Sequence, residues 1–370
     1  MSHKSFLEIV DQFNKQKKAE MITVGVKEQH VQKIKFSSPY LNYMLYGGFP
    51  RGRIVEFFGT EGSGKTTTSL DVVAGAQELF QYEWEQKLAQ YDGSTKKADI
   101  QEYEKLKEQG PAKCVFIDLE HTLNQKWAEL IGVNTKENFY YVAPIASSAE
   151  EILDLIIDFA KSGEVGLIVL DSICYLVPEA QLDVSLEKKE YGGASKVLSS
   201  FVKKVTPYLN EYNTSLLLIN QLRDSMDPYK LYETPGGRAL KFAYSLRLYF
   251  QKGQLLNKNF EPVPRREENP KGIEVQVKVE KTKISKPDRP YGVYRISFDT
   301  GIEWVYDLYD VLVSYGVIVQ SGSWVNFVNP NTGEYMDEYK VQGRIKAVEL
   351  LKENEYLLEM YLQYTENQFK

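Results

Sequence analysis

A glycine-rich stretch that ends in a lysine and a threonine is the clearest chemical signal in the sequence. It fits the pattern G-x-x-x-x-G-K-[ST] in full, and its residues are Gly59, Thr60, Glu61, Gly62, Ser63, Gly64, Lys65 and Thr66. Glycines let backbone N–H groups turn inward around a polyphosphate, and the N-terminus of a following helix adds positive potential. In this pattern the lysine reaches the β- and γ-phosphates and the threonine hydroxyl binds Mg²⁺. The sequence therefore predicts a nucleoside triphosphate site, with Thr67 beside it at the start of a helix.

Carboxylates follow two apolar runs further along the chain. Asp171 closes the run 167–170, where an acid can hold Mg²⁺ opposite the phosphate loop or can simply cap a helix. Asp118 and Glu120 lie at the end of the other run, 115–118. A carboxylate there can orient and deprotonate the water that attacks a γ-phosphate. The spacing alone does not choose between these two acids.

Predicted strands and helices alternate around these residues. The strands are 54–58, 114–118, 139–142, 166–170 and 214–220, and the helices are 67–80, 124–132, 148–162 and 192–212. Such alternation favours an α/β fold with a mostly parallel sheet and helices on both faces. Ligands of these folds bind beyond the carboxyl ends of the strands. Lys65, Glu120, Asp171 and Gln221 all lie at such ends, so we expect them to converge.

Composition and charge restrict the class of protein. The 370 residues are 43% hydrophobic and carry a net charge of −6, which weighs against a protein that coats DNA constitutively. No apolar run approaches the ~20 residues of a membrane span, and the first residues do not resemble a secretory leader. The two cysteines, Cys114 and Cys174, lie in or beside apolar runs, which is typical of thiols in a reducing cytoplasm. We therefore expect a cytoplasmic protein with no membrane partner.

Several further segments resemble the bacterial RecA recombinases in order and spacing. They are GRIVE at 52–56, IDLEH at 117–121, VLDS at 169–172, INQ at 219–221 and GGRALKF at 236–242. The likeness runs from about residue 33 to the C-terminus, with one insertion, and the departures from cellular sequences favour a phage-encoded member. The resemblance implies a RecA-like P-loop NTPase core, an N-terminal oligomerisation helix and a small C-terminal α/β lobe.

The resemblance also assigns roles around the nucleotide, which it identifies as ATP. It makes Glu120 the catalytic glutamate and Gln221 the residue that senses the γ-phosphate and signals to a DNA loop. Asn124 and Trp127 fall where the family sandwiches adenine, although the family usually has Asp and Tyr there. Trp127 can still stack on a purine, and the alternative is a core tryptophan on a helix.

Lys281 and Lys283 occupy positions i and i+2 of a predicted strand, so they point to the same face. Such a pair is by itself typical of a solvated strand edge. The resemblance implies that both lysines reach the γ-phosphate of a neighbouring subunit, where they stabilise the transition state as an arginine finger does.

Two segments without regular periodicity, 179–191 and 223–235, correspond to the family's DNA loops. Cations there would neutralise phosphates and aromatic rings would stack on bases, whereas the alternative is a pair of mobile surface loops. The candidate DNA-binding residues are Tyr191, Lys196, Ser199, Lys203, Arg223, Tyr229, Gly236, Gly237 and Arg238.

The resemblance divides the chain into three parts. Residues 1–32 would be a helix and linker for subunit docking, although a helix folded onto its own core is the alternative. Residues 33–302 would form the ATPase core, in which about 81–110 form an inserted helical hairpin. Residues 303–370 would form a C-terminal α/β domain. The hairpin is either a surface for a partner or a neutral decoration.

The expected function is that of a DNA-dependent ATPase that forms helical filaments on single-stranded DNA and exchanges strands with a homologous duplex. A single-strand-binding protein or a mediator is a further candidate partner. A hexameric helicase with the same core fold and a non-catalytic RecA-like accessory protein are the alternatives. The complete set of Lys65, Glu120, Asp171, Lys281 and Lys283 argues against the accessory protein.

Overall fold

The computed structural model describes residues 5–17, 31–182, 184, 193–224, 232–264 and 266–369. The chain divides into two units, residues 1–32 and 33–370. In the first unit, α1 (Phe6–Lys17) is an amphipathic helix whose side chains Phe6, Leu7 and Ile9 are exposed. The predicted role of this helix in subunit docking stays a prediction.

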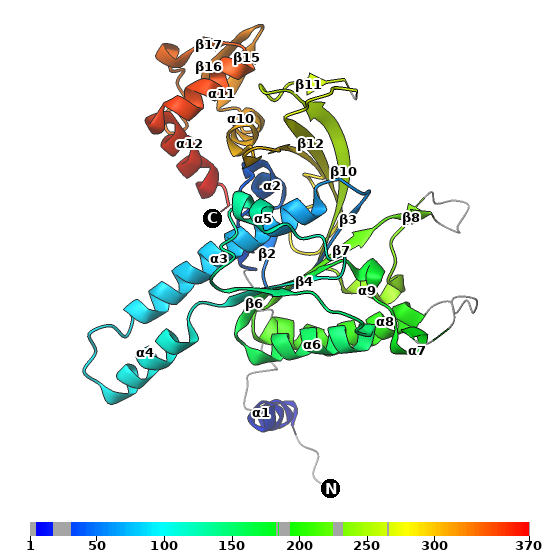
Figure 1. Cartoon of the computed structure of the whole chain (residues 1–370). Coiled ribbons are helices and arrows are strands. Elements are labelled where there is room, and N and C mark those ends of the chain that lie inside the picture. The colour runs from blue at the N-terminus through cyan, green and yellow to red at the C-terminus, as the bar shows by residue number, and fades with distance from the viewer. Residues whose placement is uncertain are drawn as a thin grey trace. The chain divides into compact units, whose positions relative to one another are not determined.

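A ten-stranded sheet forms the centre of the second unit (Figure 1). Strands β10, β3, β7, β6, β4 and β5 lie side by side in that order and run parallel. Strands β12, β13 and β14 continue the sheet beyond β10 in antiparallel pairs, and β11 also pairs with β10. The strands are β3 (Ile54–Gly59), β4 (Lys113–Asp118), β5 (Phe139–Val142), β6 (Val165–Asp171), β7 (Ser215–Gln221), β10 (Leu246–Leu256), β11 (Pro262–Val263), β12 (Gly272–Thr282), β13 (Tyr291–Ser297) and β14 (Gly301–Ile302). The predicted α/β fold with a mostly parallel sheet is confirmed.

Helices cover both faces of this sheet, with α3 (Lys65–Ala89) and α5 (Gln125–Ile131) on one and α6 (Ala149–Ser162) and α8 (Gly193–Glu211) on the other (Figure 1). Side chains along a strand point alternately to the two faces. In β4, Phe116 therefore packs in the apolar cluster under α3, whereas its neighbours Val115 and Ile117 pack in the cluster under α6 and α8. Two cores, one on each face, thus hold the carboxyl ends of the strands in place.

Short elements connect these layers. They are β1 (Lys33–Ile34), α2 (Pro39–Met44), β2 (Phe49–Pro50), the 3-10 turn η1 (Ile173–Tyr175), α7 (Glu179–Leu182), β8 (Arg223–Asp224), β9 (Tyr232–Glu233) and α9 (Gly237–Ala243). Strands β8 and β9 pair with each other in an antiparallel manner at the two ends of the second candidate DNA loop.

The hairpin begins where α3 continues past the core. The helix runs to Ala89, well beyond its last buried residue Phe80, and α4 (Lys97–Gln109) returns beside it. The Trp84 indole N–H donates to the carbonyl oxygen of Leu106 at 2.7 Å and so joins the two arms. Arg51 contacts Glu83 at 2.6 Å at the base of the hairpin.

Replacing residues 85–108 with a short Gly/Ser turn is expected to preserve ATP hydrolysis per filament subunit. The hairpin leads into Lys113, at the amino end of β4, whereas nucleotides bind at the carboxyl ends of parallel strands. Measuring turnover per assembled subunit together with the rate of filament nucleation separates an effect on hydrolysis from an effect on assembly. A variant that folds and assembles normally yet no longer hydrolyses ATP would show that the hairpin reaches an active site.

The chain after Ile302 has an apolar cluster of its own. It comprises α10 (Trp304–Ser314), β15 (Ile318–Ser321), β16 (Trp324–Phe327), the 3-10 turn η2 (Asp337–Tyr339), β17 (Val341–Gln342), α11 (Arg344–Glu353) and α12 (Glu355–Asn367). Leu308, Phe327, Leu351 and Tyr361 are among the fully buried side chains of this lobe. The three strands form a separate antiparallel sheet.

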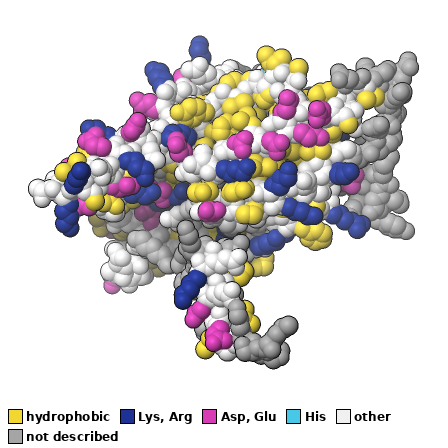
Figure 2. Space-filling model, turned by 90° about the horizontal axis from the view of Figure 1, so that it is seen from below, with side chains coloured by type: hydrophobic (Ala, Val, Ile, Leu, Met, Phe, Trp, Pro, Cys, Tyr) yellow, Lys and Arg dark blue, Asp and Glu magenta, His cyan; other side chains and the backbone are white. Residues whose placement is uncertain are grey.

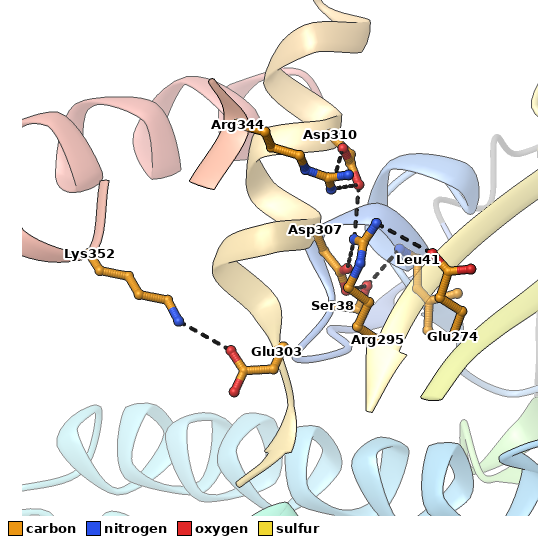
Figure 3. A network of polar contacts seen from close by, with 9 residues as sticks. All are labelled: Ser38, Leu41, Glu274, Arg295, Glu303, Asp307, Asp310, Arg344 and Lys352. Atoms are coloured by element: carbon orange, nitrogen blue, oxygen red, sulfur yellow. Dashed lines mark hydrogen bonds and ion pairs between the residues drawn. The ribbon is translucent and has the colours of Figure 1, made fainter. Parts of the chain in front are cut away.

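A network of charges, buried at Arg295 and Asp307 and partly exposed at Asp310 and Arg344, joins this lobe to the central sheet (Figure 3). Arg295 of β13 lies 3.0 Å from Asp310 and 3.5 Å from Asp307, both on α10. Asp310 also accepts a hydrogen bond from Arg344 of α11 at 2.7 Å. The Ser38 hydroxyl, at the start of α2, donates to the fully buried Asp307 at 2.6 Å. Burial raises the pKa of Asp307 well above its usual range.

A second buried carboxylate lies in α3. Both carboxylate oxygens of Asp71 accept from the backbone N–H of Ser37, at 3.1 Å each. Burial raises the pKa of Asp71 from 3.8 to about 7, although the hydrogen bonds from Ser37 act in the opposite direction. The nearby charge of Glu78 contributes to this raised pKa.

Asp71→Asn is expected to raise the free energy of unfolding, relative to the wild type, by more at pH 8 than at pH 5. Because the folded-state pKa of Asp71 is raised, its contribution to stability is complete below pH 3.8 and is lost as the pH rises through about 7. An amide stays neutral and can still accept from Ser37, so the variant escapes this loss, which is on the order of 1–3 kcal/mol. Urea denaturation at both pH values, with the exposed Asp92→Asn as control, measures the difference. An equal effect of Asp71→Asn at the two pH values would contradict the assignment.

Candidate active site

The phosphate loop lies between β3 and α3, and two of its positions require glycine for different structural reasons. Gly59 ends β3 between Gln221 of β7 and Phe250 of β10. A Cβ at Gly59 would lie 2.1 Å from the carbonyl oxygen of Phe250, so no larger residue fits. Gly64 precedes α3 with a φ of +86°, in the left-handed region that favours glycine. The free N–H groups at the start of α3 are thereby directed into the loop.

Lys65 folds back over this loop. Its ammonium group donates to the carbonyl oxygen of Thr60 at 2.7 Å and to that of Gly59 at 3.2 Å. Burial lowers the pKa of Lys65, whereas the nearby carboxylates of Asp171 and Glu120 act in the opposite direction. The cation therefore lies in the loop, close to the predicted catalytic acids.

A cleft of about 300 Å³ opens beside the loop. It is lined by Gly62, Ser63, Gly64, Lys65, Thr66, Thr67, Trp127, Lys252, Ile273, Ile296 and Phe298. The last four residues were not predicted, because they lie in or just after β10, β12 and β13, which are far along the chain from the phosphate loop. No local pattern in the sequence could have indicated them.

The two candidate adenine-binding residues lie at the start of α5. Asn124 caps this helix by accepting from the backbone N–H of Trp127 at 3.1 Å. The half-buried Trp127 donates its indole N–H to Thr67 at 3.2 Å. Trp127 therefore joins α5 to the first turn of α3, at the wall of the cleft.

Thr66 and Asp171 form the candidate metal site. The Thr66 hydroxyl donates to Asp171 at 2.7 Å. Burial is the main reason that the pKa of Asp171 is raised to about 7. The charges of Glu120 and Asp118 act in the same direction, whereas the hydrogen bond from Thr66 and the charge of Lys65 act in the opposite one. A hydroxyl and an anionic carboxylate are the hard oxygen ligands that Mg²⁺ prefers, so these residues fit that cation. Among the described residues, His, Cys, Asp and Glu form no cluster of three or more that could hold a metal by themselves.

The hydrogen bonds distinguish Glu120 from Asp118. Asp118 accepts from the backbone N–H groups of Glu120, Thr122 and Leu123 at 2.9–3.0 Å, and its carboxylate is therefore committed to shaping the turn after β4. Glu120 instead accepts from side chains at 2.8 and 2.9 Å, those of Ser172 and Gln221. Ser172 was not predicted as a site residue, although it directly follows Asp171.

Lys281 and Lys283 lie at the end of β12 and just beyond it. The ammonium group of Lys281 donates to the carbonyl oxygens of Lys241 and Phe242 at 2.6 and 3.2 Å, and that of Lys283 donates to Phe242 at 2.7 Å. Both lysines thus contact the carboxyl end of α9 within their own chain. Burial and the neighbouring charges of Lys283 and Arg247 lower the pKa of Lys281.

The candidate DNA-binding residues of α8 share one face of that helix. Lys196, Ser199 and Lys203 are three and four positions apart, which places them on the same side. A Cβ at Gly237 would lie 3.2 Å from Cβ of Ser195, so the start of α9 packs against the start of α8.

The remaining candidates lie around these helices. Gly236 has a φ of +108° and precedes α9, whereas Arg238 is exposed on α9 and Arg223 is exposed on β8. Tyr191 and Tyr229 lie outside the described residues. The face shown in Figure 2 carries Lys and Arg interspersed with acidic and hydrophobic side chains, rather than a broad surface of one charge. Among the described helices, none has the length and apolarity needed to cross a bilayer.

Comparison with known proteins identifies the relatives of this chain. The model of the RecA N-terminal domain matches residues 4–82 and 95–303. The chain belongs to the RecA family. It is 34% identical over 316 residues to Protein RecA of Thermus aquaticus, covering 85% of this chain and 78% of that protein. It is 31% identical over 355 residues to Protein RecA of Campylobacter lari, covering 95% of this chain and 88% of that protein.

Membership of the RecA family confirms two predictions, a RecA-like fold and the function of an ATP-hydrolysing recombinase. The RecA match omits residues 83–94, which form the outer end of α3 and the turn before α4. This part of the hairpin therefore distinguishes the chain from the RecA domain model.

Proposed function

We propose that this chain assembles with ATP into helical filaments on single-stranded DNA, pairs it with a homologous duplex and exchanges the strands. As a RecA family member, the chain is a DNA-dependent ATPase of recombination. The contact between Glu120 and Gln221, 2.9 Å long, is the observation that carries the mechanism. It joins the acid beside the phosphate loop to the end of β7, after which the second candidate DNA loop begins.

Each residue then has a role in hydrolysis. The loop from Gly59 to Thr66 binds the phosphates through its N–H groups and Lys65, and Trp127 with Asn124 binds the adenine. Thr66 and Asp171 would hold Mg²⁺, which neutralises phosphate charge when bound. Glu120 orients the attacking water and accepts its proton, while Ser172 and Gln221 keep its carboxylate in position.

Assembly supplies the remaining groups in this proposal. The exposed apolar side of α1 docks on a neighbouring subunit, as exposed apolar surfaces commonly do. Lys281 and Lys283 leave the end of α9 and contact the γ-phosphate bound by that neighbour. The candidate residues of α8, α9 and the two loops bind the DNA. The three-part domain division, a phage origin, a cytoplasmic location and a single-strand-binding or mediator partner belong to the same proposal.

Electron microscopy of the protein with single-stranded DNA and a slowly hydrolysed ATP analogue tests this function. We expect open helical filaments, and we expect Lys65→Ala to form far fewer of them. Closed rings would instead favour a hexameric helicase. The absence of any assembly, in protein that binds ATP, would favour an accessory protein.

A further inference from the structure

We propose that three side chains, the fully buried Asn220 and Glu56 and the partly buried Arg247, position the root of the second DNA loop relative to Gln221. The loop root is Thr234 and Pro235, the two residues that precede the Gly236–Gly237 turn into α9. The inference rests on the proposed function, and it names positioning residues rather than groups that touch ATP or DNA.

Asn220 provides the direct connection. Because neighbouring residues of a strand point to opposite sides, Gln221 faces Glu120 while Asn220 is fully buried. The Asn220 amide donates to Glu56 at 2.8 Å and to the carbonyl oxygen of Pro235 at 3.1 Å. Its own oxygen accepts from the Cys174 thiol at 3.2 Å and from the backbone N–H of Gln221 at 3.0 Å. All the hydrogen-bonding groups of this side chain are therefore used.

Glu56 and Arg247 provide a second connection to the same loop root. The fully buried Glu56 accepts from the Arg247 guanidinium at 2.5 Å. Another nitrogen of that guanidinium donates to the Thr234 hydroxyl at 3.1 Å. The guanidinium carbon lies 4.7 Å from the centre of the Phe58 ring, which holds the planar group from one side. Breaking a buried pair of this kind is costly, so the three groups are expected to move together.

The two connections bring three functional elements to one place. Asn220 precedes the γ-phosphate sensor on β7, and Thr234 and Pro235 lead into α9. Arg247 of β10 lies opposite Lys281 of β12 in the sheet, next to the lysine proposed to act on the neighbouring subunit. We therefore expect a displacement of the end of β7 by the nucleotide to be passed to the loop root through these side chains.

Thr234→Val tests this inference with little risk to the fold, since valine keeps the shape of threonine and removes only the acceptor for Arg247. The measurement is the affinity for a fluorescent oligothymidylate, in the presence of a slowly hydrolysed ATP analogue and then of ADP. We expect the ratio of the two dissociation constants to fall by about fivefold or more, at the lower end of typical coupling between sites. Nucleotide binding without DNA should change by less than about twofold, since Thr234 does not line the nucleotide cleft.

Two matched variants serve as controls. Thr234→Ser retains the hydroxyl and should keep the wild-type ratio. Thr214→Val removes an equally buried hydroxyl at the amino end of β7, where it donates to the carbonyl oxygen of Val165 at 2.7 Å, and should also keep that ratio. If the ratio fell equally in Thr214→Val and Thr234→Val, the effect would be one of general destabilisation, and the inference would be overturned.

A folded Thr234→Val protein with the full wild-type ratio would also overturn the inference, while leaving the proposed function intact. Asn220→Ala should reduce the ratio further, because it removes the direct connection to Pro235. A wild-type protein whose DNA affinity does not respond to the nucleotide would overturn the proposed function itself, and this inference with it.

Discussion

Glu120→Gln is expected to lower ATP turnover by ~10²–10⁴-fold while ATP binding and filament formation persist. The amide has the size of the carboxylate and can still accept a hydrogen bond from Ser172, so the surroundings of residue 120 are kept. It cannot take a proton from water, and that is the function removed. Steady-state phosphate release, with nucleotide binding measured in parallel, separates the loss of chemistry from a loss of affinity.

Asp118→Asn is the informative comparison for this variant. Because Asp118 accepts from three backbone N–H groups and from the Tyr141 hydroxyl, its substitution should disturb the turn and reduce stability. Near-normal turnover in Glu120→Gln would reject Glu120 as the group that activates water. Asp118 would then again be the candidate.

Lys281→Ala and Lys283→Ala are expected to abolish DNA-stimulated hydrolysis, with losses of ~10³-fold or more. Nucleotide binding to the monomer should remain nearly intact, because both lysines contact the end of α9 rather than their own phosphate loop. DNA-stimulated turnover and DNA-free nucleotide affinity are the two measurements.

Mixed filaments give the sharpest test of action between subunits. Lys65→Ala lacks only the lysine of its own phosphate loop, so it can still supply Lys281 and Lys283 to a neighbour. Mixing it with either lysine variant should restore part of the activity at some interfaces. No recovery in mixtures shown to assemble together would count against action on a neighbouring subunit.

The sequence allowed predictions for those parts of the candidate site that short segments encode. The phosphate loop is contiguous, and Asp171 and Gln221 each end an apolar strand, so their convergence followed from the general geometry of parallel sheets. The choice between Asp118 and Glu120 did not follow from spacing, because both residues lie at the end of one strand. The prediction of Glu120 rests on the resemblance to a family, and the different hydrogen bonds of the two carboxylates support it.

Contacts between distant segments could not be predicted in this way. Lys252 of β10 and Phe298, which follows β13, line the cleft because the order of strands in the sheet brings them to it. No periodicity in the sequence indicates that contact. The same holds for Lys281, whose contact with the end of α9 joins residues forty positions apart. Tyr191 and Tyr229 stay predictions, since they lie outside the described residues.

The charges around Arg295 also bear on how modular the protein is. Cutting the chain after residue 302 would remove Asp307, Asp310 and Arg344 together. Arg295 would then keep only Glu274 of these ion-pair partners, and both side chains would become exposed to solvent. Grafting the lobe of a relative onto this core would have the same consequence unless the graft carried matching carboxylates. Core and lobe therefore depend on each other through these ion pairs. A shortened or chimeric version must supply carboxylates for Arg295 before its activity can be interpreted.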